Sequence, residues 1–130
     1  MTYQPDWDID LRDGKAGEDL VRDTLLLTDE QIEVKTDRKA RSTGNLYIET
    51  HCRRRDGWHP SGINTTKATA WFFVLDSDDK LMVSITTEAL KRQVARFGRR
   101  VAEERDGTHP TKGVLVPLAG LLREAIRVAA

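Results

Sequence analysis

The stretch IEVKTD, at positions 32–37, carries the side chains of this sequence that are best suited to chemistry. Three charged residues, Glu33, Lys35 and Asp37, occupy every second position of it. Successive side chains of a β-strand point to opposite faces, so this spacing puts an acid, a base and a second acid on one face. A carboxylate beside an amine can hold a divalent metal ion and orient a water molecule that attacks a phosphodiester. The stretch therefore predicts a strand whose charged face carries out hydrolysis.

A second alternating stretch, NLYIETHC at positions 45–52, follows the basic loop RKARSTG. We expect the two strands to form an antiparallel hairpin, in which Glu33 lies opposite Glu49 and Lys35 lies opposite Tyr47. Two carboxylates at that distance repel each other unless a cation lies between them. Hard oxygen ligands suit Mg²⁺ or Mn²⁺, so the hairpin predicts a site for one of these ions.

Two further acids are candidate metal ligands. Glu18 belongs to a helix predicted over 14–27, three and seven residues before Val21 and Leu25. This spacing places Glu18 on the border of the apolar stripe, where its carboxylate points toward the sheet more than toward water. Asp37 shares the charged face of the first strand, and it is either a further ligand or a partner of the loop arginines.

The elements that must position these residues follow the order α-β-β-α-β-β-α-(β)-α. The run WFFVLD is continuously apolar, which predicts a strand covered on both faces. Thr86 is the expected N-cap of a long helix. We therefore predict an α/β protein with a central mixed sheet flanked by helices. The expected elements are a helix over 14–27, strands over 31–37 and 45–52, a short helix over 63–70, strands over 71–76 and 81–87, a helix over 87–105, a strand over 114–116 and a last helix from Pro117 onward.

Composition bounds the class of protein. The 130 residues fit a single domain spanning 1–130. Lys and Arg together number 21, as do Asp and Glu, so only local charge can indicate a polyanionic partner. Cys52 is the only cysteine, which excludes an intramolecular disulfide and favours a reducing, cytoplasmic compartment. No signal peptide is visible and no apolar run approaches the ~20 residues of a membrane span, so we expect no membrane partner.

The segments GKAGEDLVRDTLL, IEVKTDRKARSTGNLYIE and PSGINTTKATAWFFVL together resemble the PD-(D/E)XK nuclease superfamily, most of all its small phage and prophage members. The resemblance implies a restriction-endonuclease-like core of αβββαβ type over roughly 10–85, with a C-terminal helical extension over 86–130. It also implies Mg²⁺- or Mn²⁺-dependent hydrolysis of DNA phosphodiesters, in the host cytoplasm for a phage protein, by a homodimer. The last apolar helix is a candidate dimer interface. By this resemblance the metal ligands are Glu18, Glu33 and Glu49, and the catalytic residues are Glu33, Lys35 and Glu49.

The order of the motif departs from the family pattern. The family places its lone acid on the earlier strand and Glu-x-Lys on the later one, whereas here Glu-x-Lys comes first and His51 stands where a Lys is expected. Either the Lys has moved to the earlier strand, or the missing carboxylate comes from before that strand, as at Asp29. We favour the first, because Glu49 supplies a second carboxylate at hairpin distance.

Basic residues flank the predicted hairpin and are expected to contact phosphates on either side of the cut site. The candidates are Arg38, Lys39, Arg41, Arg53, Arg54 and, by the resemblance, Lys67. Two other function classes fit the same residues. One is a catalytically inactive nucleic-acid-binding module of the same fold, and the other is a phage structural or interaction protein whose charges form only ion pairs. The sequence leaves open whether the DNA is duplex, single-stranded, flapped or a junction.

Overall fold

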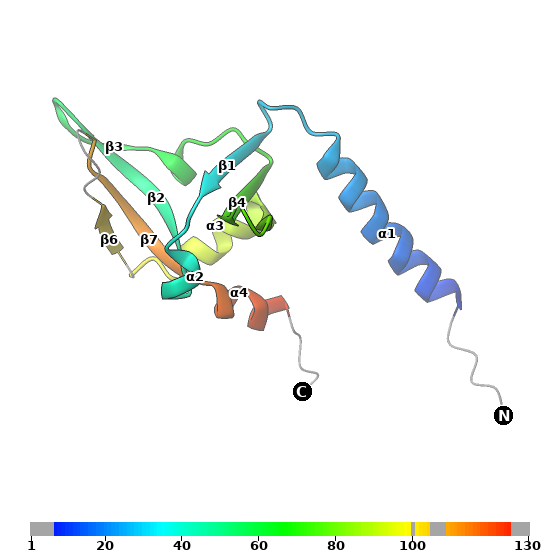
Figure 1. Cartoon of the computed structure of the whole chain (residues 1–130). Coiled ribbons are helices and arrows are strands. Elements are labelled where there is room, and N and C mark those ends of the chain that lie inside the picture. The colour runs from blue at the N-terminus through cyan, green and yellow to red at the C-terminus, as the bar shows by residue number, and fades with distance from the viewer. Residues whose placement is uncertain (1–6, 100, 105–108, 126–130) are drawn as a thin grey trace.

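The chain contains both helices and strands, which confirms the predicted α/β class. The structure is a computed structural model that describes residues 7–99, 101–104 and 109–125. The elements, labelled in Figure 1, are α1 (Trp7–Leu25), β1 (Ile32–Thr36), α2 (Ala40–Thr43), β2 (Asn45–Arg54), β3 (Gly57–Pro60), the 3₁₀ helix η1 (Gly62–Asn64), β4 (Ala70–Asp76), β5 (Leu81–Thr86), α3 (Thr87–Arg96), β6 (Val101–Glu104), β7 (Thr111–Pro117) and α4 (Leu118–Ala125).

The strands form two sheets, where the sequence predicted a single central one. Sheet A has the order β1-β4-β5, with β1 parallel to β4 and β4 antiparallel to β5. Sheet B is antiparallel and has the order β3-β2-β7-β6. In Figure 1, β1 and β2 diverge from a corner at α2, and α1 projects away from the rest of the described chain.

The predicted hairpin between the first two strands is wrong, because β1 and β2 belong to different sheets. Glu33 pairs with Trp71 on β4, and Glu49 pairs with Gly113 on β7. The corner between the two strands explains the difference. Asp37 accepts hydrogen bonds from the backbone N–H of Ala40 at 3.1 Å and of Tyr47 at 2.9 Å. These bonds hold the connection as one helical turn, which sends β2 away from β1.

The hydrophobic core lies between the two sheets. β4 supplies its largest side chains, and α3 packs against it through Leu90. Thr86 accepts a hydrogen bond from Ala89 N at 3.2 Å, which confirms the predicted N-cap. The buried core residues are Ala40, Leu46, Ile48, Ile63, Trp71, Phe73, Leu75, Leu90, Val114 and Val116.

The two faces of sheet A differ in polarity, and we call them inner and outer. The inner face meets the core through Trp71 and Phe73, whose partners on β1 are Glu33 and Lys35. Paired residues of neighbouring strands point to the same side of a sheet. The charged face of β1 is therefore the inner one. The outer face carries the rows Ile32–Ala70–Thr86, Val34–Phe72–Ser84 and Thr36–Val74–Met82.

The C-terminal part departs most from prediction. The helix predicted over 87–105 ends at Arg96, and the segment 101–104 pairs as β6 with β7. Phe97 is the C-cap and Gly98 follows it, so a residue with low helix propensity stands where the helix stops. Positions 100 and 105 of the predicted helix lie outside the described residues. β3 was also missed, in a segment interpreted as a turn-rich loop. No helix in the described ranges is long and apolar enough to cross a membrane.

Gly62 is the position where the backbone geometry tolerates least change. Its φ is +57°, and a Cβ there lies 2.2 Å from the backbone oxygen of Glu49. We expect Gly62→Ala to lower the free energy of unfolding by about 2 kcal/mol or more, since left-handed strain and a backbone clash add. Chemical denaturation measures the effect. Gly44→Ala is the control, because Gly44 has a φ of +76° but open space around it. Equal losses for both variants would contradict the clash.

Candidate functional site

Glu33 and Lys35 form the most compact pair of chemically useful groups on the inner face of sheet A. Lys35 Nζ lies 2.9 Å from Glu33 Oε1. The side chains are 40% and 37% exposed respectively, so a large substrate can reach both. They lie at the free edge of sheet A, since β1 pairs only with β4 among the described strands. The predicted acid–base pair on one strand face is thus present.

Trp71 forms the floor beside this pair. Its ring is 1% exposed and lies against Phe73, with 6.0 Å between the ring centroids. Lys35 Nζ lies 5.9 Å from the centroid of the Trp71 ring. An ammonium over an indole face is attracted by the ring quadrupole, which holds the Lys35 side chain against the sheet. The indole Nε1–H of Trp71 is buried and has no hydrogen-bond partner within the described part of the chain.

The other predicted metal ligands do not join this pair. Glu49 lies on β2, and its pairing with Gly113 puts it on the face of sheet B that carries Tyr47. Glu18 is exposed, and it belongs to α1, which projects away from both sheets in Figure 1. Among the residues that the structure describes, no three His, Cys, Asp or Glu side chains gather closely enough to hold a metal ion.

Asp37 has a structural role that the sequence did not reveal. Both of its carboxylate oxygens accept backbone hydrogen bonds at the corner, Oδ1 from Ala40 and Oδ2 from Tyr47. Its own N–H donates to Val74 O at 2.9 Å, which extends the β1–β4 ladder by one residue. The carboxylate that was proposed as a metal ligand is therefore used to build the corner.

The basic residues predicted to contact DNA are exposed, and Arg41 among them forms hydrogen bonds to two carboxylates. Arg41 Nη1 donates to Asp76 Oδ2 at 2.5 Å and to Asp79 Oδ2 at 3.1 Å. These carboxylates raise the pKa of Arg41, the hydrogen bond to Asp79 most of all. Arg41 thus ties the corner to the β4–β5 turn. The other residues of the predicted set, which are also exposed, are Arg38, Lys39, Arg53, Arg54 and Lys67.

A β-bulge changes which residues of β2 face inward. The β2–β7 register shifts between Glu49 and His51, so Ile48 pairs with Val114 and His51 with Lys112. Side chains on the core-facing side of β7 continue from Val114 to Lys112, and His51 therefore shares the inner face of sheet B. Strict alternation along NLYIETHC would place His51 on the face of Glu49, and the bulge makes that inference wrong.

A cationic and aromatic surface continues from the core along this inner face. Lys112 Nζ lies 4.2 Å from the centroid of the Trp58 ring. Trp58 on β3 is the cross-strand partner of Arg53 on β2. The half-buried indole and the cations around it can stack a base and hold a phosphate. We call Arg53, Trp58 and Lys112 the cationic–aromatic surface.

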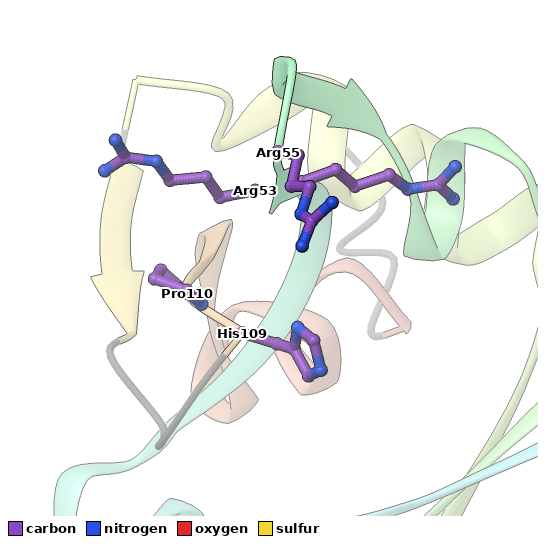
Figure 2. Close-up of a pocket in the computed structure, with 5 residues that line it drawn as sticks. Arg53, Arg55, His109 and Pro110 are labelled. Carbon is purple, nitrogen blue, oxygen red and sulfur yellow. The ribbon is translucent and has the colours of Figure 1, made fainter.

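An open pocket of about 490 Å³ adjoins the end of β2. Figure 2 shows Arg53 and Arg55 reaching outward around it, with His109 and Pro110 below them. The N–H of Arg53 donates to Pro110 O at 2.9 Å, which fixes the base of the pocket. Its lining residues are Arg53, Arg54, Arg55, His109 and Pro110. Three arginines that line one open pocket can bind a phosphate or another oxyanion.

The turn next to the pocket contains one acid, Asp56, which is held by the ring of His59. His59 Nε2 and Asp56 Oδ1 lie 2.6 Å apart. This hydrogen bond lowers the pKa of Asp56. The carboxylate is thus directed to its own hairpin, so the neighbouring arginines remain available to an anion.

Sequence reasoning missed four residues of this region: Arg55, Trp58, His109 and Lys112. The run RRR at 53–55 had indicated phosphate contacts, but His109 and Lys112 lie more than fifty positions further along. No local spacing links them to β2, because only the β2–β7 ladder brings them together. Comparisons with family models, with curated proteins and with solved structures found no significant match to this chain.

The contact of Arg41 with the β4–β5 turn gives a prediction on acid titration. The pKa of Asp76 is lowered from 3.8, first by the backbone N–H of Asp79, then by that of Asp78 and by Arg41. Since the folded pKa is the lower one, the stabilisation is present above pH 3.8 and is lost as pH falls through the folded value. We expect Arg41→Ala to raise the pKa of Asp76 only part of the way to 3.8, because both backbone donors remain. NMR titration of the carboxyl carbon measures it, and full reversion to 3.8 would contradict the assigned order of causes.

Proposed function

We propose that this protein binds DNA and hydrolyses its phosphodiester bonds with a divalent metal ion, Mg²⁺ or Mn²⁺. The observation that carries the proposal is the pair of Glu33 and Lys35, whose charged atoms lie 2.9 Å apart at an accessible sheet edge. A carboxylate and an ammonium at that spacing are the groups that metal-dependent phosphodiester hydrolysis uses. The resemblance of the sequence to PD-(D/E)XK nucleases supports the same chemistry.

The carboxylate of Glu33 is a suitable ligand for Mg²⁺. Mg²⁺ binds through one or two carboxylates and substrate phosphates, and it retains several waters. Glu33 provides one half-exposed carboxylate of that kind. Glu49 and Glu18 remain proposed ligands, and both lie on other elements in this conformation. A bound Mg²⁺ would act as a Lewis acid and stabilise the negative charge on the phosphoryl oxygens.

Three side chains of this protein have separate roles in the proposed reaction. Glu33 anchors the site on β1. Lys35 donates hydrogen bonds from its ammonium, which hold the attacking water or stabilise the charge that develops on the phosphoryl oxygens. Trp71 keeps the Lys35 side chain against the sheet. Water attacks phosphorus and loses a proton to solvent, the ester P–O bond breaks, and the leaving oxygen takes a proton from solvent.

The DNA-binding part of the proposal rests on sheet B. Arg53, Arg54 and Arg55 surround the pocket at the end of β2, and Trp58 and Lys112 lie next to Arg53. Arginines bind phosphates in a sequence-independent manner, and an aromatic ring accepts any base. The surface therefore suits DNA without a preferred sequence. We further propose that the protein is a phage-type nuclease and that it acts as a homodimer in the host cytoplasm.

A second candidate function is a DNA-binding module that does not cut. Glu33 is already paired with Lys35, and the other proposed carboxylates lie on β2 and α1. This separation favours binding over catalysis, while the basic pocket serves both functions equally.

Catalysis is tested by nicking of supercoiled plasmid in Mg²⁺ or Mn²⁺. We expect wild-type protein to nick the plasmid, and Glu33→Gln and Lys35→Ala to lower the rate by about 10²–10³-fold, because each removes a group that acts in the transition state. The matched controls are Glu30→Gln and Lys91→Ala, which change exposed residues outside the site. Nicking by Glu33→Gln at the wild-type rate would refute the assigned site. Binding without nicking by the wild type would support the second candidate.

DNA binding is tested by fluorescence anisotropy in Ca²⁺ over a range of salt concentrations. We expect Arg53→Ala to weaken binding about tenfold and to reduce the slope of log K against log[salt] by about 0.9, the value for one lost phosphate contact. Arg41→Ala is the matched control, since Arg41 is held by Asp76 and Asp79. A larger loss of DNA affinity in Arg41→Ala than in Arg53→Ala would indicate that DNA binds at the corner and not at the pocket.

A further inference from the structure

The three rows of residues on the outer face of sheet A form an apolar surface and contain no charged residue. Six of the nine residues in its three rows are apolar and three carry hydroxyl groups. Val34 is 55% exposed and Met82 is 58% exposed, so no described element covers this side of the sheet fully. The central strand β4 has the continuous apolar run that is typical of a strand buried on both faces. Helix α3 covers only the inner face, through Leu90 in the core. The outer face therefore lacks the cover that its sequence predicts.

Helix α1 has the complementary feature. It is an amphipathic helix of 19 residues, and Leu20, Val21 and Leu25 on it are exposed, Leu25 by 75%. Val21 and Leu25 lie four residues apart and share one face of the helix. Figure 1 shows α1 projecting away from both sheets. One chain thus holds an apolar helix face without cover and an apolar sheet face without cover.

The connection between α1 and β1 keeps the helix away from its own sheet. Thr28 donates to Gln31 Oε1 from its N–H at 3.0 Å and from its hydroxyl at 3.1 Å, and Gln31 N donates to Thr28 O at 2.9 Å. Gln31 O in turn accepts from Thr69 N at 2.6 Å, at the start of β4. The link is therefore a hydrogen-bonded turn tied to sheet A, and it favours the projecting position of α1 in Figure 1.

We propose that α1 of a second copy of this chain covers the outer face of sheet A, in a reciprocal exchange that forms a two-fold dimer. This deepens the homodimer of the proposed function and does not depend on catalysis. A two-fold exchange buries both unpartnered faces of each chain, and it doubles the area of a single helix-on-sheet contact. The dimensions agree, because three strands spaced about 4.8 Å apart form a strip about 10 Å wide, which matches the diameter of one helix.

The test measures the mass of the full chain in solution by sedimentation velocity over a range of concentrations. We expect wild-type protein to sediment with twice the chain mass. Leu25→Glu on α1 and Val34→Lys on β1 should each raise the dimer dissociation constant at least tenfold, since each puts a charge into the proposed contact. Both residues are exposed in the single chain, so neither change disturbs the core. The matched controls are Ala16→Glu, on the opposite side of α1, and Leu122→Lys, on α4.

Cross-linking separates exchange between copies from folding within one chain. In a Cys52→Ser background, tagged Leu25→Cys protein is mixed with untagged Val34→Cys protein and oxidised. A covalent species that contains one tagged and one untagged chain supports the exchange. The proposal is overturned by a monomeric wild type, or by dissociation in Leu122→Lys instead of Leu25→Glu. It is also overturned if a chain carrying both cysteines forms only an internal disulfide. DNA binding and nicking are measured separately, so this proposal and the proposed function can fail independently.

Discussion

The corner built by Asp37 is the constraint on which the rest of the structure depends. Its carboxylate accepts the N–H groups of Ala40, the first residue of α2, and of Tyr47 in β2. A charged acceptor bound to two backbone donors is stronger than a neutral hydrogen bond, so the chain direction is fixed at this point. Because β2 leaves the corner away from β1, β4 becomes the partner of β1. The two-sheet arrangement, the buried core between the sheets and the position of the Glu33–Lys35 pair all follow from that choice.

The sequence predicts what depends on neighbours along the chain and fails on what depends on partners across space. Alternation with a period of two and continuous apolar runs locate the ends of β1, β2, β4 and β5 to within one or two residues. Thr86 caps α3 as its position indicates. Alternation alone states that Glu33 and Lys35 share a face, but it does not state which strand lies beside them. The hairpin was inferred from alternation alone, so the predicted position of Glu49 opposite Glu33 is wrong as well.

The candidate site shows the same limit in a second way. A β-bulge after Glu49 places the following residues of β2 on the opposite face from the one that alternation predicts. No residue type in this segment predicts the bulge. Lys112 and His109 join the end of β2 only through the β2–β7 ladder, from a segment that carries no pattern linking it to β2. Asp37 resembles a metal ligand by spacing, but its oxygens are used by backbone donors that appear only once the turn has formed.

Strand β1 inverts the usual distribution of polar and apolar residues, and this inversion joins the two proposals. A charged pair normally faces water and a valine normally faces the core. Here Glu33 and Lys35 share the core-facing side with Trp71, while Val34 is 55% exposed on the other side. The Lys35 ammonium compensates the Glu33 carboxylate, which limits the cost of placing either group beside the core. The apolar outer side has no such compensation within one chain. A helix supplied by a second copy removes that apolar surface from water, so the same strand presents charge to a substrate on one side and a docking surface on the other.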